Sequence, residues 1–108
     1  MRVLVVNKPR LAVQPEQLPI LAQGALDWLD RHRDSIESFG VFPGGGGFGV
    51  VNVADEDALH QMMMEMPFTP FGDVTITPVV DGDSAFARLV QFAEAMSAGG
   101  PPGAEPAV

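Results

Sequence analysis

Residues 58–76 read ALHQMMMEMPFTPFGDVTI, and this stretch decides the fold of the chain. Its first half carries apolar side chains at the three- and four-residue spacing of one helix face: Leu59, Met62, Met63 and Met66. Pro67 and Pro70 then force a corner, because proline cannot continue a helix. A strand with alternating side chains is predicted directly after the corner, over residues 73–80. The stretch therefore indicates a short amphipathic helix that turns into a strand.

Further elements are predicted on the N-terminal side of this unit. Strands are expected over residues 2–7, 36–42 and 48–53, where apolar residues are continuous or alternate. Pro43 to Gly47 separates the last two strands and predicts a hairpin with a flexible tip. A first long helix is predicted from about Leu18 to Arg33, with one apolar stripe made of Leu18, Leu21, Ala22, Ala25, Leu26 and Leu29.

Two aspartates are predicted to cap helices, because their carboxylates can accept hydrogen bonds from the free amides of a first turn. Asp55 is the expected cap of the helix that contains the methionines. Asp83 is the expected cap of a last helix, whose apolar side would hold Phe86, Leu89, Val90 and Ala93. Both helices are therefore expected to bury one face.

Size and composition limit the organisation of the chain. A length of 108 residues with 46% hydrophobic content suits one core, so a single domain is predicted over residues 1–97. Residues 98–108 are rich in glycine and proline and are predicted to form a disordered tail. The order of elements is β-α-β-β-α-β with an additional C-terminal helix. This order predicts an α+β, ferredoxin-like fold with helices on one face of one sheet.

Charge and cysteine content exclude several classes of partner. With 6 basic and 14 acidic residues, the net charge of −8 argues against nucleic acid and against an anionic membrane surface. The chain has no cysteine, so it has neither disulfides nor thiolate ligands. The apolar run at residues 1–6 is too short for a signal peptide or a membrane span. We therefore expect a cytoplasmic protein.

Two conspicuous motifs have simpler structural interpretations. Gly44 to Gly49 satisfies G-x-G-x-x-G, but a strand follows it instead of the helix that phosphate binding needs, so a hairpin tip or a mobile lid is favoured. The cluster of Met62, Met63, Met64 and Met66 is explained by core packing better than by soft metal binding. His60 and Glu65 lie five residues apart, which is a poor spacing for a metal pair on a helix. Neither a metal nor a cofactor is expected.

The chain resembles the muconolactone isomerase family in the stretch quoted above. The family has a similar helix that begins Ala-Leu-His, a Leu-Pro or Met-Pro break, a Pro-aromatic pair and an aspartate that opens an alternating strand. The matching positions here are Ala58 to His60, Met66-Pro67, Pro70-Phe71 and Asp73. The resemblance implies a dimeric α+β barrel that can assemble into a larger oligomer. A homodimer also follows from the first strand, which is apolar on both sides and needs cover on both faces of the sheet.

The family resemblance implies a cofactor-free isomerase that moves a proton next to an unsaturated carbonyl. Glu37 and His32 are the candidate bases, although both also suit exposed, solvated positions. Asn52 is a candidate for orienting the substrate or stabilising an oxyanion. The family tends to have an acidic residue at the position of Asn52 and a tyrosine at that of Phe48, and its second strand is more basic. These departures favour an apolar substrate over a carboxylated one.

Aromatic residues gather in the hairpin and in the corner, and could line a cavity for a flat, hydrophobic molecule: Phe39, Phe42, Phe48, Phe68 and Phe71. Three functions stay open at this point. The first is proton-transfer isomerisation or cyclisation of an unsaturated, largely apolar carbonyl or lactone compound. The second is a cofactor-independent monooxygenase of the same barrel architecture. The third is a ligand-binding or scaffold dimer without catalysis. The sequence does not name the substrate.

Overall fold

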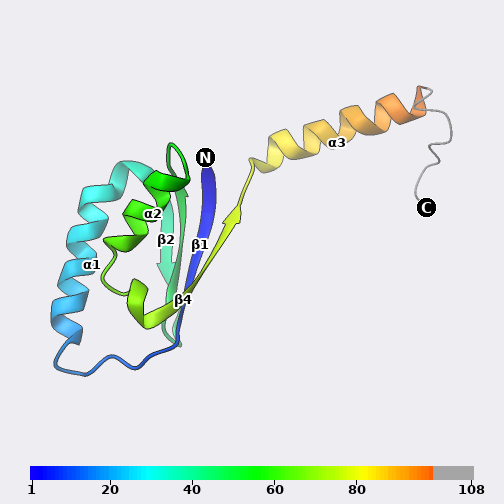
Figure 1. The fold of residues 1–108 in the computed structure, drawn as a ribbon. Helices are drawn as coiled ribbons and strands as arrows, with labels where there is room; N and C mark the ends of the chain where they lie inside the picture. The colour runs from blue at the N-terminus through cyan, green and yellow to red at the C-terminus, as the bar shows by residue number, and fades with distance from the viewer. Residues whose placement is uncertain (99–108) are drawn as a thin grey trace.

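The computed structural model describes residues 1–98 and has one antiparallel sheet with two helices on one face and a third helix that projects away (Figure 1). The elements are β1 (Arg2–Pro9), α1 (Leu18–His32), β2 (Ile36–Val41), β3 (Gly47–Asn52), α2 (Glu56–Met64), β4 (Gly72–Pro78) and α3 (Gly82–Ser97). The strand order is β2-β3-β1-β4. This confirms the ferredoxin-like α+β fold. The predicted tail lies outside the described residues except for Ala98.

The core lies between the sheet and the two helices that cover it. Val3 pairs with Val51 across β1 and β3, so both side chains point to the same face, where they are 1% and 3% exposed. Leu59 and Met62 of α2 pack on them, together with Trp28 of α1. Each such side chain contributes about 1.5–3 kcal/mol through the removal of apolar surface from water. The predicted stripe of α2 is confirmed in these two residues.

The buried face of α1 differs from the predicted stripe. Leu18 and Leu26 are 46% and 54% exposed, and the buried residue of the helix is Trp28. Its indole Nε1 donates a hydrogen bond to the carbonyl oxygen of Met62 at 2.9 Å, which ties α1 to α2. The packing of the large indole and this hydrogen bond decide which face of α1 turns toward the sheet. The predicted stripe was based on leucine and alanine spacing alone and left Trp28 out.

One of the two predicted helix caps is correct. The Asp55 carboxylate accepts a hydrogen bond from the amide of Ala58 at 2.8 Å, as predicted. The prediction for Asp83 is wrong, because Asp81 caps α3 and accepts from the amide of Ser84 at 2.9 Å. Asp81 has the extended backbone that a cap requires, whereas Asp83 already lies in the first turn.

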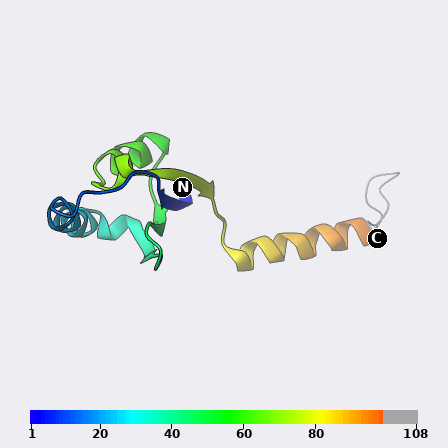
Figure 2. The same ribbon diagram turned by 90° about the horizontal axis from the view of Figure 1, so that it is seen from below.

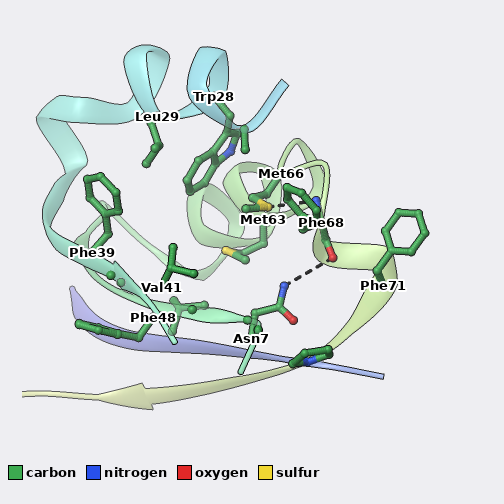
Figure 3. A pocket seen from close by; sticks show the side chains of 18 of the residues that line it. Asn7, Trp28, Leu29, Phe39, Val41, Phe48, Met63, Met66, Phe68 and Phe71 are labelled. Carbon is green, nitrogen blue, oxygen red and sulfur yellow. Dashed lines mark hydrogen bonds between the residues drawn. The ribbon is translucent and has the colours of Figure 1, made fainter. Parts of the chain in front are cut away.

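The corner between α2 and β4 is held by local hydrogen bonds. The hydroxyl of Thr69 donates to the carbonyl oxygen of Met63 at 2.8 Å, and a 3-10 turn, Thr69–Phe71, leads into β4. Met66-Pro67 ends the helical stretch, as the sequence indicated. The corner brings Phe68 and Phe71 beside the end of β1, on the same side of the sheet as the helices (Figure 3).

The face of the sheet opposite the helices has no cover among residues 1–98. Strand pairing places Leu4 opposite Val50 and Val6 opposite Phe48 on this face. All four side chains are at least partly exposed. We call these four residues the open face. None of the described helices has the length and apolar content needed to cross a membrane.

Candidate ligand-binding cavity

A cavity of about 590 Å³ lies between the covered face of the sheet, α1 and the corner after α2 (Figure 3). Its size is within the range of about 300–1,000 Å³ that is typical of small-molecule sites. Its wall is made largely of aromatic, aliphatic and thioether side chains, among them Trp28, Leu29, Phe39, Met63, Met66 and Phe68. Such a wall favours a flat and mostly apolar occupant.

Asn7 is a polar residue of the cavity lining. Apart from the indole N–H of Trp28, its amide is the polar side-chain group among the lining residues. β1 directs it to the same face as Val3 and Val5, because alternate side chains share a face. Its Nδ2 donates a hydrogen bond to the carbonyl oxygen of Phe68 over a long distance of 3.5 Å (Figure 3). Its Oδ1 lies close to Gly72. An amide has two donors and two acceptor lone pairs, so Asn7 keeps capacity for a hydrogen bond to a ligand.

The glycine tip of the β2–β3 hairpin forms one end of the cavity wall. Gly45 and Gly46 have φ values of 104° and 78°, which glycine adopts without strain. The turn is closed by two hydrogen bonds of 2.9 Å, from the amide of Phe42 to the Gly46 carbonyl and from the amide of Gly45 to the Phe42 carbonyl. A side chain at Gly46 would collide with the carbonyl oxygen of Asn7. Glycine therefore allows the tip to approach β1 closely.

The structure brings four of the five predicted aromatic residues to the cavity lining: Phe39, Phe48, Phe68 and Phe71. Phe48 borders the cavity at the level of β3, but its ring lies on the open face and packs over Gly40, where an added Cβ would lie 2.5 Å from the ring. Phe42 is not among the lining residues. Its ring contacts that of Phe48, with centroids 5.8 Å apart.

The three predicted polar site residues lie outside the lining. Glu37 accepts a hydrogen bond from the guanidinium of Arg2 at 3.0 Å. Asn52 pairs with Arg2 across the strands and is exposed at the end of β3. His32 contacts Glu65, and its ring lies 5.3 Å from that of Trp28. Their catalytic and binding roles stay predictions, and the geometry does not gather them into one group.

Sequence reasoning missed Asn7 and Trp28 as lining residues. The signal for Asn7 was available, because it follows Val3 and Val5 at a spacing of two and must share their face. The segment after β1 was also missed, since Leu11, Ala12 and Val13 have no regular spacing that marks them as a wall. Among residues 1–98, no group of three His, Asp or Glu side chains is arranged to hold a metal ion.

His32 and Glu65 connect the C-terminal ends of α1 and α2. The His32 Nε2 atom lies 3.0 Å from Oε2 of Glu65. The hydrogen bond from the His32 ring, with a second one from Gln61, lowers the pKa of Glu65 below its ordinary value of 4.5. A carboxyl group whose pKa is lowered by folding stabilises the protein above its unfolded pKa, and this contribution is lost as the pH falls through the folded pKa. We expect Glu65→Gln to flatten the fall of the melting temperature below pH 4.5.

This pH dependence is measured by thermal unfolding over the acid range. Glu16→Gln, which changes an exposed carboxylate outside the helices, is the control, and Glu65→Gln should flatten the acid branch more than this control does. An acid branch that is the same in wild type and Glu65→Gln would contradict the stabilising role of the His32–Glu65 pair.

Comparisons with known proteins support the fold and leave the reaction open. A family model described as "Domain of unknown function (DUF3303)" matches residues 32–95. A crystal structure of muconolactone isomerase is similar with a TM-score of 0.66 and 21% identity, over 78% of this chain and 93% of that chain. A second similar structure is that of 5-chloro-2-hydroxyhydroquinone dehydrochlorinase from Burkholderia phenoliruptrix AC1100 in complex with 2,5-dihydroxybenzoquinone. Its TM-score is 0.62 and its identity 18%, over 78% of this chain and 98% of that chain. No curated protein matches the sequence. The predicted muconolactone isomerase-like fold is confirmed.

Proposed function

We propose that this chain, which belongs to the DUF3303 family, binds a flat, uncharged and largely apolar carbonyl compound in the cavity between its sheet and α1. The observation that carries the proposal is the lining itself, which combines apolar and aromatic side chains with a single amide at Asn7. The rings would supply contact area, and the amide would orient one polar group of the ligand. None of the lining residues is a lysine, arginine or histidine, so a carboxylate would be poorly compensated there.

The reaction we propose is proton-transfer isomerisation or cyclisation of such a compound. Its support is the likeness in fold to an isomerase and to a dehydrochlorinase with a bound quinone. A base is required, and no lining residue can act as one, so the base would come from outside the lining. Of the two predicted bases, His32 is the one that contacts the cavity wall, because its ring packs against that of Trp28.

Non-catalytic ligand binding is the second candidate, and the same lack of an ionisable lining side chain favours it. Proton NMR in D₂O distinguishes the two once a ligand is known. Deuterium at the carbon beside the carbonyl, lost in His32→Ala, would support catalysis with His32 as the base. Tight binding without exchange in the wild type would support the non-catalytic role.

We also propose that the protein is a homodimer in which the open face is covered. Leu4, Val6, Phe48 and Val50 form an apolar surface whose burial stabilises association at about 25 cal/mol per Å² removed from water. The high negative charge of each chain opposes association, so self-association should strengthen as salt screens the repulsion.

The binding proposal is tested by the fluorescence of Trp28, which is the one tryptophan of a chain without tyrosine. We expect saturable changes in its emission with 1-tetralone, a neutral bicyclic ketone. The carboxylate of 2-naphthoic acid has a similar ring system and a charge, and it should bind more weakly. Equal response to both compounds, or no response to either, would count against an uncharged carbonyl ligand.

The role of Asn7 gives a separate prediction. Asn7→Leu keeps the size of the side chain and removes its hydrogen bonds, so the affinity for 1-tetralone should fall about tenfold, as one lost hydrogen bond implies. The parent hydrocarbon tetralin should bind as well as before or better. Isothermal titration calorimetry measures both ligands, with Asn52→Leu as the control at an exposed site. A similar loss for ketone and hydrocarbon would mean that Asn7 acts only through packing.

A further inference from the structure

We propose that the tip of the β2–β3 hairpin supplies a hydrogen-bond donor to the cavity: the backbone amide of Gly46 binds the carbonyl oxygen of the ligand, together with the side-chain amide of Asn7. The inference rests on the function proposed above, because it names the group of the ligand that the tip recognises. It gives the glycine run a role beyond the closing of the hairpin.

The tip presents backbone atoms to the cavity. Four consecutive lining residues, Gly44 to Gly47, have no side chain, so the atoms that they offer to a ligand are main-chain atoms. The wall around them is made largely of aromatic, aliphatic and thioether side chains. A main-chain amide is a strong donor, and its hydrogen bond is stronger in such apolar surroundings than in water. The tip therefore adds polar groups to a wall that is otherwise poor in them.

The hydrogen bonds of the tip leave one half-buried donor unused. The amide of Gly45 donates to the Phe42 carbonyl, and the Gly46 carbonyl accepts from the amide of Phe42, both at 2.9 Å. Gly46 lies just before β3 begins, outside the strand pairing. Within residues 1–98 its amide donates to no backbone or side-chain acceptor. A half-buried amide without a protein acceptor bonds to water or to a ligand.

The unused donor lies next to Asn7. Asn7 pairs with Gly47 across β1 and β3, and residues paired in this way have Cα atoms about 4.5–5.5 Å apart. Gly46 approaches β1 so closely that an added Cβ would collide with the carbonyl oxygen of Asn7. The Nδ2 atom of Asn7 has two hydrogens, and one of them is given to the Phe68 carbonyl over 3.5 Å. The second hydrogen and the Gly46 amide come from neighbouring positions of the wall, so one oxygen can accept from both.

Both donors are held in place before a ligand binds. β1 pairs on both sides, since Asn7 lies opposite Gly47 of β3 and Val74 of β4. The two hydrogen bonds between Phe42 and the glycines close the tip. Donors that are fixed in advance need no rearrangement when charge develops on a bound oxygen.

α3 leaves the tip uncovered within the chain. It follows β4 at the end of the sheet where Pro78 pairs with Val3, whereas Asn7 and Gly47 pair toward the other end. Figures 1 and 2 show that α3 projects away from the sheet and its two helices. This helix therefore gives the Gly46 amide neither an acceptor nor cover.

Two donors at the carbonyl oxygen suit the proposed proton transfer. The base takes a proton from the carbon beside the carbonyl, the electrons of the broken C–H bond form a C=C bond, and the carbonyl π electrons move to the oxygen. Return of the proton to another carbon of the conjugated system restores the carbonyl. The charge that develops on the oxygen strengthens both hydrogen bonds, so the donors stabilise the enolate more than the ketone.

The position of the donors also limits the class of ligand. Asn7 comes from the sheet and Trp28 from α1, on either side of the cavity (Figure 3). A carbonyl oxygen at the edge of a fused ring system reaches the two donors while the rings contact the indole and the other aromatic side chains. The tip therefore favours a bicyclic or larger ketone over a hydrocarbon of the same shape.

The direct test is ¹⁵N NMR of the tip amides with a ketone and its parent hydrocarbon. At saturation with 1-tetralone we expect the amide proton of Gly46 to move downfield, because it gains a hydrogen bond to the carbonyl. Tetralin has the same rings without the oxygen and should leave this proton near its free position. The amide of Gly45 already donates to the Phe42 carbonyl, so it is the control within the same tip and should move little with either compound. Equal shifts of Gly46 with the two compounds would overturn the proposal.

Replacement of single peptide bonds by esters measures the contribution of the donor. An ester at Gly46, introduced by chemical ligation of synthetic segments, replaces the N–H by oxygen and keeps every side chain. The affinity for 1-tetralone should fall about tenfold, as loss of one hydrogen bond implies, and that for tetralin should stay within about twofold. An ester at Gly44, whose residue is exposed in the same tip, is the matched control and should change neither affinity. Similar losses from the two esters, or no loss from the ester at Gly46, would contradict the proposal.

Asn7→Leu separates the two donors. The carbonyl carbon of 1-tetralone, labelled with ¹³C, should resonate downfield of its position in cyclohexane when the wild type binds it. The variant removes one donor and should remove only part of this shift, because the Gly46 amide remains. Loss of the whole shift would mean that Gly46 does not bind the oxygen.

The two proposals can fail separately. Binding of 1-tetralone and tetralin with equal effects on Gly46 would keep an apolar ligand site and overturn the role of the tip. Absence of binding by both compounds would remove the proposed function and this inference with it, and the fluorescence of Trp28 detects that outcome without reference to the tip.

Discussion

Gly46→Ala is expected to destabilise the protein by about 3 kcal/mol and to weaken ligand binding. Gly46 has a φ of 78°, which costs an L-residue about 1–2 kcal/mol. A Cβ there would also collide with the carbonyl oxygen of Asn7 and lie 2.9 Å from Cδ of Pro9. The tip of the hairpin must move away from β1 to relieve these contacts, and this movement changes the wall of the cavity and the position of Asn7.

Gly44→Ala is the matched control for this prediction. Gly44 lies in the same tip and lines the same cavity, but a Cβ there would meet no atom within 4 Å, and its backbone is not left-handed. Urea unfolding should give a free energy within about 0.5 kcal/mol of wild type for Gly44→Ala. Similar losses in the two variants would show that the tip does not depend on its close approach to β1.

Trp28→Ala is expected to cost about 3–5 kcal/mol of folding free energy, which is the usual range for removing a buried aromatic side chain. Trp28 is 7% exposed, belongs to the core and also lines the cavity. The variant loses the hydrogen bond from the indole to the Met62 carbonyl as well as the packing. A domain of this size has about 5–15 kcal/mol of stability, so the variant should be close to unfolding.

Trp28→Phe and Leu26→Ala separate the causes of that loss. Trp28→Phe keeps an aromatic ring and removes the hydrogen bond, so it should cost less than Trp28→Ala. Leu26→Ala changes a residue of the same helix that is 54% exposed, and it should be nearly neutral. Circular dichroism follows unfolding, because the variants at position 28 lack the fluorophore. A loss for Leu26→Ala as large as that for Trp28→Ala would contradict a core centred on the indole.

The elements of the fold could be predicted from the sequence because their signals are local. The methionine spacing, the cap at Asp55 and the corner at Pro67 each depend on a few neighbouring residues. The error at Asp83 arose because Asp81 and Asp83 are equivalent as residue types, and only the backbone decides which one caps α3. Similarly, the rotation of α1 depends on the bond between Trp28 and Met62, which are 34 residues apart.

The cavity could be predicted only in part, because it depends on pairing between distant segments. The aromatic residues of the hairpin and the corner were identified by composition, and four of them line the cavity. Asn52 was predicted to orient the substrate, but it lies on the same side as Phe48 and Val50, which is the open face of the sheet and not the wall of the cavity. The face of Asn7 could have been predicted from its spacing after Val3 and Val5, but its contact with Phe68 depends on pairing between distant segments and is not visible in local sequence.

The most direct test of the proposed binding site is a two-dimensional ¹⁵N NMR titration that follows two side-chain signals, the amide of Asn7 and the indole of Trp28. These groups come from β1 and α1 and share only the cavity. The proposed function predicts that both signals shift together and saturate at one concentration of 1-tetralone, while the exposed amide of Asn52 stays in place. Shifts at Asn52 with Asn7 and Trp28 unchanged would contradict a ligand site in this cavity.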